Sequence, residues 1–353
     1  MKTKTTEWQN IQLFAGIDLH KNKWVVTVRT ATTHLVTFVA PPMKEKLAQT
    51  LKKRWPSAKI NAVYEAGCFG YHLADYLNSK GIVTIIVAAH TIPTPRGSFV
   101  KTDRIDSRKL ALELSKGSLE SIYLRSREEL FNRNLIRKRI QLVKRKRQLI
   151  VRIKADITFY DIKFDFQVRE YLSKKVIKKL REFEYENEFF SYLFKQYVDE
   201  YEVVMENIKK IDIWLEEVTS SAQHQEKYAL LRTVPGIGKL AASSLLLEIG
   251  DIDRFSSKGK FVSYLGLTPS EYSSGEKVRN GSLSGMGHNC LRTLLVECAW
   301  QAIKIDPVLL KKFYSLSEKK GKLRAIIAVT RKLATRIHYV LKTSQPYVVG
   351  VVK

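Results

Sequence analysis

Two long helical patterns in the middle of the chain constrain its fold more than any other feature. The first runs from Ser126 to Tyr160, is strongly basic, and has an apolar stripe formed by Leu130, Leu135, Ile140, Leu142, Leu149 and Ile153. The second runs from Glu188 to Val218, with near-heptad spacing of Met205, Ile208, Ile211, Leu215 and Val218. These patterns predict a helical, coiled-coil middle region at residues 126–226. Its apolar faces pair either with each other or with another subunit.

Residues 1–125 have the pattern of a mixed α/β domain. Three β-rich runs come first, and polar turns separate them; they lie at residues 11–20, 23–30 and 34–40. Helix and strand patterns then alternate, at residues 44–55, 59–67, 71–81 and 82–89. This order predicts an antiparallel meander that continues into one mixed sheet with helices packed on it.

The charge of the chain points to a polyanionic partner. The chain has 61 Lys and Arg residues against 35 Asp and Glu residues, a formal net charge of +26. Such an excess favours nucleic acid as the partner. The basic run Arg137, Lys138 and Arg139 is a candidate contact, although charge runs also occur as solvated helix faces.

Other features disfavour a membrane or secreted protein. No run of about 18 apolar residues occurs, so no segment is predicted to span a bilayer. The N-terminus has no apolar core of the signal-peptide type. The odd number of cysteines, without metal-type spacing, predicts reduced and buried thiols in a cytoplasmic protein; they are Cys68, Cys290 and Cys298.

Four acidic residues can meet at one edge of the predicted sheet. Asp18 and Glu65 each end a strand, while Asp103 and Asp106 share one face of a helix's first turn. Such a cluster is costly unless cations neutralise it, and oxygen ligands favour Mg²⁺, or Mn²⁺, over zinc. Two such ions would suit phosphoryl transfer. From spacing alone the alternative is equally good: turn and helix caps at Asp18 and Asp103, and a helix-dipole partner at Asp106.

The last segment, residues 227–353, is predicted to be mostly helical. Its stretch "VPGIG" lies between two helical patterns and is typical of a helix-hairpin-helix motif. In such a motif Gly236 and Gly238 permit a tight turn whose backbone N–H groups meet a DNA phosphate, and Lys239 adds charge. The alternative is an ordinary Pro-Gly turn between two helices.

A Gly- and Ser-rich segment follows and is predicted to be a flexible loop. It offers serines at positions 270, 273, 274, 282 and 284. Lys277, Arg279 and His288 could stabilise a phosphate beside it. A serine is a weak nucleophile unless a base or metal activates it, and the residue pattern selects no particular serine. The segment could equally be a loop and nothing more.

The chain resembles the DEDD transposases of bacterial insertion sequences, the family of bridge-RNA-guided recombinases. The N-terminal stretches "GIDLHKNKWVVTV", "VYEAG" and "VKTDRIDSRKLA" carry the resemblance, together with "PGIG" and "FVSYLGLTPSEYSSGEKVRNGSLSGMGHNCLRTLL" near the C-terminus. The resemblance implies a RuvC-like, RNase-H-like N-terminal domain with four Mg²⁺ ligands: Asp18, Glu65, Asp103 and Asp106. It also implies that Ser274, in a "Y-x-S-G" motif, is the nucleophile, with Ser273 its closest rival. Ser107 stands where the family more often has alanine.

The resemblance further implies a recombinase with a two-part active site. The acid quartet of one subunit would hold Mg²⁺ on the scissile phosphate, and Ser274 of another subunit would attack it to form a phosphoserine link. The implied partners are donor and target duplex DNA, a structured guide RNA, and further copies of the chain in a dimer or tetramer. The expected location is the bacterial cytoplasm, at the nucleoid.

Three other functions compete with this one. A hydrolytic nuclease of the junction-resolvase kind would use water and leave Ser274 structural. A nucleic-acid-binding protein with an inactive site is disfavoured because all four acids are present. An ATP-dependent kinase of the actin-like fold is disfavoured because no second phosphate-binding half accompanies "GIDLHKN".

Overall fold

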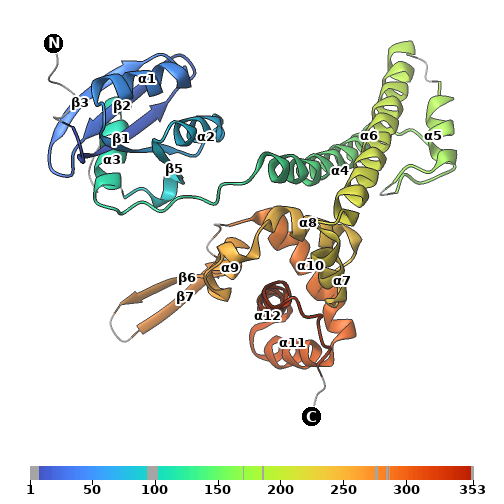
Figure 1. Cartoon of the computed structure of the whole chain (residues 1–353). Helices are drawn as coiled ribbons and strands as arrows, with labels where there is room; N and C mark the ends of the chain where they lie inside the picture. Colours follow the sequence, from blue (N-terminus) through green and yellow to red (C-terminus); the bar gives the residue numbers. More distant parts are fainter. Residues whose placement is uncertain are drawn as a thin grey trace. The chain divides into compact units, whose positions relative to one another are not determined.

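A computed structural model describes residues 8–93, 102–169, 171–184, 187–274, 277–283, 285 and 287–350, and the side chains of residues 271–280 lie outside this description. The chain divides into two compact units, Met1–Leu124 and Arg125–Lys353 (Figure 1). Residues on both sides of position 226 share one hydrophobic core. The predicted limit there, between a helical region and a C-terminal domain, stays a prediction.

The first unit is built on one mixed five-stranded sheet of order β3-β2-β1-β4-β5. Strand β1 pairs antiparallel with β2 and parallel with β4, while β2–β3 is antiparallel and β4–β5 parallel. This arrangement confirms the predicted mixed α/β fold. The strands are β1 (Gln12–Leu19), β2 (Trp24–Arg29), β3 (His34–Ala40), β4 (Lys59–Glu65) and β5 (Val83–Val87). The helices are α1 (Lys44–Arg54), α2 (His72–Ser79), the 3-10 turn η1 (Ala89–Thr91) and α3 (Asp103–Ser115).

Both faces of the sheet are covered, which is why β1 is buried at successive positions. One face carries the larger core, with Leu13, Ile17 and Tyr64 packed against residues of α1 and α2. The other face receives α3. At Gly16 a Cβ atom would lie 2.2 Å from the Ser107 carbonyl oxygen, so only glycine lets α3 approach β1 this closely.

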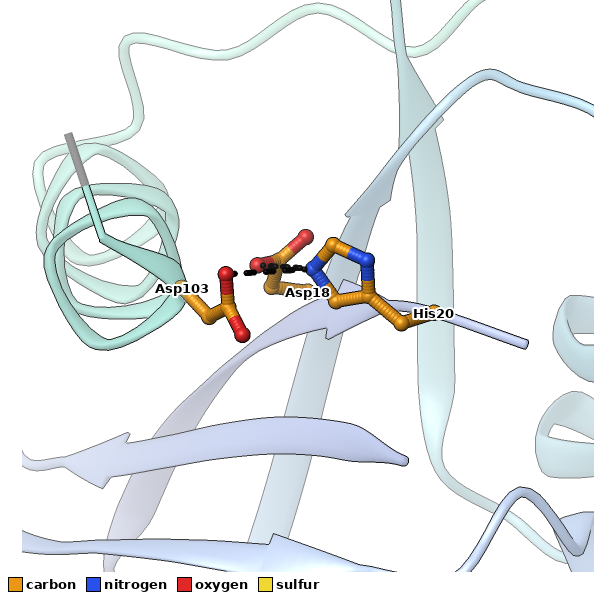
Figure 2. A group of neighbouring side chains, drawn as sticks. All are labelled: Asp18, His20 and Asp103. Atoms are coloured by element: carbon orange, nitrogen blue, oxygen red, sulfur yellow. Dashed lines mark hydrogen bonds and ion pairs between the residues drawn. The ribbon is translucent and has the colours of Figure 1, made fainter. Parts of the chain in front are cut away.

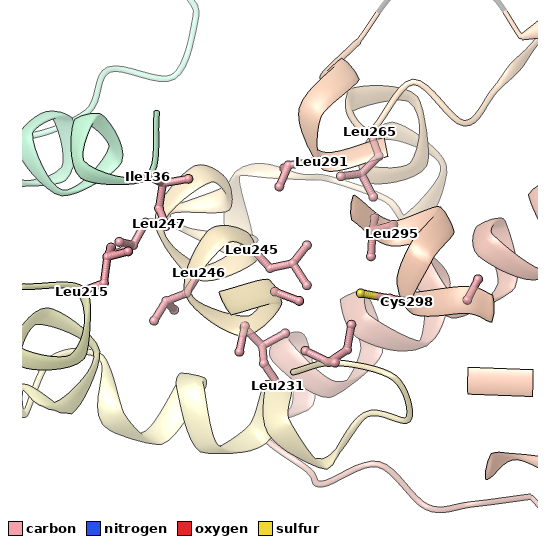
Figure 3. Close-up of a cluster of buried hydrophobic side chains, with 14 of the residues drawn as sticks. Ile136, Leu215, Leu231, Leu245, Leu246, Leu247, Leu265, Leu291, Leu295 and Cys298 are labelled. Carbon is pink, nitrogen blue, oxygen red and sulfur yellow. The ribbon is translucent and has the colours of Figure 1, made fainter. Parts of the chain in front are cut away.

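The second unit is mostly helical, as predicted. Its long helices are α4 (Arg127–Phe159) and α6 (Glu188–Ser220), and the others are α5 (Lys174–Arg181), α7 (Gln225–Thr233), α8 (Lys239–Ile249), α9 (Lys258–Tyr264), α10 (Asn289–Ile305), α11 (Pro307–Lys320) and α12 (Lys322–Thr343). The 3-10 turn η2 (Ile252–Arg254) and a hairpin of β6 (Pro269–Ser274) and β7 (Lys277–Leu283) complete it. Figure 3 shows leucines of the buried helix α8 among side chains of α4, α6, α7 and α10. Of the three cysteines, only Cys298 has the predicted burial.

Helices α4 and α6 pair with each other in antiparallel fashion. Three arginines of α4 contact α6 in reversed order along the sequence: Arg139 to Asp212, Arg145 to Glu200, and Arg152 to Tyr197. Most of the predicted apolar positions of both helices lie in the core of this unit, and Ile136 and Ile150 of α4 join them. Ile140 and Met205 are exposed, contrary to prediction. The two faces therefore meet within one chain, and assembly through this region stays a prediction.

A charged substitution at Ile208 should destabilise the fold, and it cannot report on assembly. Ile208 is 8% exposed, so Ile208→Asp would bury an unpaired carboxylate, at a cost of several kcal/mol. Ile213 on the same helix is 49% exposed and is the matched control. We expect Ile208→Asp to lower the melting temperature strongly and Ile213→Asp to leave it nearly unchanged. Equal melting temperatures for the two variants would contradict this packing. Light scattering of Ile213→Asp then tests assembly.

Candidate functional site

Asp18 and Glu65 lie at the ends of the neighbouring strands β1 and β4, at the same edge of the sheet. Strands β1 and β4 run parallel, and their last paired residues are Ile17 and Tyr64, so Asp18 and Glu65 are the next positions on each. Side chains alternate along a strand, which puts Asp18 on the face of Gly16, and Glu65 on the face of Val63. That face packs against α3. The first part of the predicted convergence is thus present.

Asp103 and Asp106 lie in the first turn of α3, as predicted. The N-cap is Thr102, whose side chain accepts a hydrogen bond from the Ile105 backbone N–H at 3.3 Å. The alternative that Asp103 caps the helix is therefore wrong, and its carboxylate is free for other contacts. Ser107 is buried, and its hydroxyl lies 2.9 Å from the Thr27 hydroxyl of β2. This contact helps to fix α3 on the sheet.

Two further side chains contact these carboxylates, and sequence reasoning missed both: His20 lies beside Asp18 and Asp103, and Lys23 pairs with Asp103. Figure 2 shows one nitrogen of the His20 ring facing both acids. Its Nε2 lies 3.0 Å from Asp18 Oδ2 and 3.4 Å from Asp103 Oδ1. Lys23 Nζ lies 2.8 Å from the other oxygen of Asp103. Both residues come from the turn after β1, so a carboxylate at a strand end followed by "HKNK" was the available signal.

The two acids differ in how readily they ionise. Burial raises the pKa of Asp18, His20 partly offsets this, and the nearby charges of Asp103 and Asp106 raise it further. The hydrogen bond from Lys23 is the main cause that lowers the pKa of Asp103. Asp106 lies one helical turn after Asp103 on α3, and among the described residues it is not part of the close group that Asp18, His20 and Asp103 form. Among the described residues, Glu65 takes part in none of these contacts, and it is exposed.

These residues fit a divalent cation. Asp18, His20 and Asp103 each offer one ligand atom, and these three atoms lie within 4.8 Å of one another. A cation would stabilise the ionised form of Asp18, whose pKa is raised mainly by burial and further by the neighbouring carboxylates. Carboxylate oxygens are ligands of Mg²⁺ and Mn²⁺, while an imidazole nitrogen suits Mn²⁺ or zinc better than Mg²⁺.

The predicted flexible loop around Ser274 is wrong, because the segment forms a β-hairpin. Ser274 ends β6 and pairs with Lys277 of β7, and Ser273 pairs with Val278. The side chains of both serines, and those of Lys277 and Arg279, lie outside the described part of the structure, as do Gly275 and Ser284 altogether. The hairpin signal was a Gly-containing two-residue connection between two runs of residues that can pair.

A buried cluster ties the base of this hairpin to the helices. The Glu248 side chain is 2% exposed, and it accepts hydrogen bonds from Arg137 Nε at 2.7 Å and from His288 Nε2 at 3.1 Å. His288 Nδ1 accepts from the Leu291 N–H and caps α10. The backbone N–H of His288 also donates a hydrogen bond to the Tyr264 carbonyl oxygen, across the base of the hairpin. Because both ring nitrogens are used, His288 has a structural role in place of the predicted phosphate contact.

Glu248→Gln should destabilise the second unit. Burial alone would raise the pKa of Glu248, but the hydrogen bonds from His288 and Arg137 outweigh it and lower the pKa to about 2. Removing one partner of such a buried pair costs about 3–5 kcal/mol. The exposed Glu318→Gln is the control. We expect Glu248→Gln to lower the urea concentration at the midpoint of unfolding, and Glu318→Gln to leave it unchanged.

The same cluster has a definite pH dependence. Because the folded pKa lies below the ordinary value of 4.5, the contribution of Glu248 is complete above that value and is lost as the pH falls toward about 2. The stability difference between wild type and Glu248→Gln should therefore shrink below pH 4.5. A difference that stays constant down to pH 3 would contradict the ion pair.

The turn between α7 and α8 contains the predicted glycines. Gly236 has a φ of +79°, and a Cβ there would lie 2.2 Å from the Cys298 carbonyl oxygen of α10. It is thus needed for the turn and for packing. Gly238 is the N-cap of α8. The Lys239 Nζ atom lies 3.6 Å from Glu216 Oε1. Binding of a DNA phosphate by this turn stays a prediction.

The basic run of α4 has partners inside the chain. Arg137 pairs with Glu248, and Arg139 Nε lies 2.5 Å from Asp212 Oδ1. Lys138 between them is exposed. Two of the three cations thus stabilise the packing of α4, and their contact with nucleic acid stays a prediction.

Comparisons with known proteins identify the family. A family model described as a transposase of the IS116/IS110/IS902 family matches residues 228–315, and a DEDD transposase model of IS110 elements matches residues 15–160. The second match contains all four acids, and the first contains the hairpin with Ser274. The chain belongs to the IS110 family of DEDD transposases. Within the described residues of this transposase, no helix combines the length and the apolarity needed to cross a bilayer.

Relatives of the transposase include proteins of insertion sequences and an inverting protein. The transposase of insertion sequence element IS1533 from Leptospira borgpetersenii is 27% identical over 95% of this chain and 97% of its own length. A protein of Sinorhizobium fredii named as a transposase is 29% identical over 74% of this chain and 64% of its own length. The pilin gene-inverting protein of Moraxella bovis is 33% identical over 40% of this chain and 45% of its own length.

Proposed function

We propose that this transposase cleaves and rejoins DNA strands through a covalent phosphoserine intermediate. In this proposal Asp18, Glu65, Asp103 and Asp106 hold Mg²⁺, and Ser274 is the nucleophile. The observation that carries the proposal is the meeting of Asp18 and Asp103, with Asp106 one helical turn from Asp103 and Glu65 on the adjacent strand end. The sheet order and its parallel β1–β4–β5 core support an RNase-H-like, RuvC-like fold.

The acidic cluster has the properties required of such a site. The two carboxylates that meet come from β1 and α3, and the close packing of α3 on Gly16 fixes these two elements against each other. A bound divalent ion would supply positive charge to the scissile phosphate and to the leaving oxygen. His20 contacts both Asp18 and Asp103, and Lys23 pairs with Asp103, so positive or hydrogen-bonding groups already face these carboxylates.

The serine step conserves the phosphodiester bond energy. The Ser274 oxygen forms a bond to phosphorus, while the bond from phosphorus to one deoxyribose oxygen breaks. The serine hydroxyl loses its proton, and the departing deoxyribose oxygen gains one. Attack by a deoxyribose hydroxyl of a second strand reverses these changes and releases Ser274. No ATP is consumed, because each step exchanges one phosphate ester for another.

Hydrolysis of DNA is the alternative function, and the same proposed metal site would support it. Carboxylate-bound ions can activate water without any serine. A denaturing gel distinguishes the two functions, because only the serine route gives a protein–DNA species that survives denaturation.

We further propose that a structured guide RNA selects the DNA sites and that the transposase acts as a homo-oligomer. The charge of +26 supports binding of two polyanions at once. In this proposal the α7–α8 turn is a helix-hairpin-helix contact to duplex DNA. Sequencing of RNA that copurifies with the transposase tests the guide. One structured species should dominate, and a random mixture of cellular RNA would contradict the proposal.

A further inference from the structure

A basic concavity lies in the second unit, between α9, α11 and α12. It is shallow, with a volume of about 300 Å³, and six residues line it: Lys258, Lys312, Ala328, Arg331, Lys332 and Thr335. All four cations are exposed, while Ala328 and Thr335 are half-buried and form the floor. Among the described residues, no carboxylate lines this concavity.

Helix geometry explains how α12 contributes most of the lining. Positions 328, 331, 332 and 335 are related by three, four and seven residues, which places them on one face of a helix. Ile326, Val329 and Leu333 are buried on the opposite side. The amphipathic pattern of α12 therefore turns a stripe of cations outward beside Lys312 of α11 and Lys258 of α9.

The surrounding helices make the positive field stronger. Residues 307–343 contain a single acid, Glu318, against ten basic residues: Lys311, Lys312, Lys319, Lys320, Lys322, Arg324, Arg331, Lys332, Arg336 and Lys342. Arg336 and Lys342 pair with Asp306 and Asp253. The four cations of the concavity have no such carboxylate partner among the described residues. Their mutual repulsion would be relieved by a bound polyanion.

We propose that this concavity binds the phosphate backbone of duplex DNA. Its open shape and exposed cations suit a backbone that lies across it, whereas a small anion would need an enclosed site. A protein partner is disfavoured because lysine is depleted in protein interfaces and the floor is small and partly polar. DNA is favoured because the chain is a transposase. The contact positions a duplex and carries no sequence information.

The salt dependence of DNA binding tests this site. The probes are a short fluorescent DNA duplex and an RNA duplex of the same length, in the presence of EDTA, so that no cleavage is needed. Each phosphate contact contributes about 0.9 to the slope of log affinity against log salt. Arg331→Gln/Lys332→Gln should therefore lower the slope for DNA by about 1.8. Lys258→Gln/Lys312→Gln should give the same result.

The matched control is Lys319→Gln/Lys320→Gln, which removes the same charge from exposed positions of α11 outside the concavity. The salt slope of this control should fall by less than half of the fall expected for the concavity variants. An equal fall in the control, or an unchanged slope in both concavity variants, would overturn the proposal. A loss confined to the RNA duplex would assign the site to RNA and would equally overturn it. Because Ser274 plays no part in this assay, the result does not depend on the proposed chemistry.

Discussion

Asp18→Asn should abolish DNA strand cleavage while DNA binding stays largely intact. Asparagine keeps the size of the side chain and removes the charge that a divalent ion needs. Loss of even an indirect partner of a bound metal costs roughly 10- to 100-fold, so we expect a fall of more than about 100-fold in the cleavage rate. Asp106→Asn should behave in the same way, because the proposed metal site includes Asp106, one helical turn after Asp103 on α3.

Two measurements separate a catalytic role from a structural one. Mg²⁺-dependent cleavage of a labelled duplex gives the rate, and binding without Mg²⁺ gives the affinity. The control is Asp75→Asn, an exposed acid of α2 in the same unit. The melting temperature of Asp18→Asn should not fall, since burial and neighbouring carboxylates disfavour the charge of Asp18 in the folded chain. Full cleavage by Asp18→Asn would remove this residue from the proposed metal site.

Ser274→Ala should eliminate both the covalent protein–DNA species and recombination. The acids and their metal could activate water, so a hydrolase would tolerate this substitution. A recombinase needs a protein nucleophile to keep the bond energy of the cleaved phosphodiester. Ser273→Ala is the matched control, because Ser273 precedes Ser274 on β6 and should keep both activities. The assay combines radiolabelled duplex, Mg²⁺ and the copurified RNA, resolved on a denaturing gel.

The acidic site could be predicted from local patterns because its geometry depends on strand ends and one helix turn. Asp18 and Glu65 each follow an apolar strand, and parallel pairing of those strands places them side by side. His20 was missed, because the stretch "HKNK" gives the residue types but not the fold of the turn that brings the ring to both carboxylates. Close approach of α3 to Gly16 likewise appears only once β1 and α3 are packed.

Long-range contacts in the second unit could not be predicted from local sequence patterns. Arg137 has the local pattern of a nucleic-acid contact, yet its partner Glu248 lies more than a hundred residues away in sequence. His288 has a partner on the same distant helix, which removes it from the predicted phosphate site. The hairpin with Ser274 was mistaken for a loop because it is rich in glycine and serine.

Mass spectrometry of the covalent product tests the central claim most directly. Trypsin should release the peptide Phe261–Lys277, which contains Ser273, Ser274 and other hydroxyl side chains. After reaction with duplex DNA and nuclease trimming, fragmentation of this peptide locates the attached nucleotide. We predict one nucleotide phosphate on Ser274. Cleaved DNA without any adduct, or an adduct on Ser273 or another residue, would contradict the account.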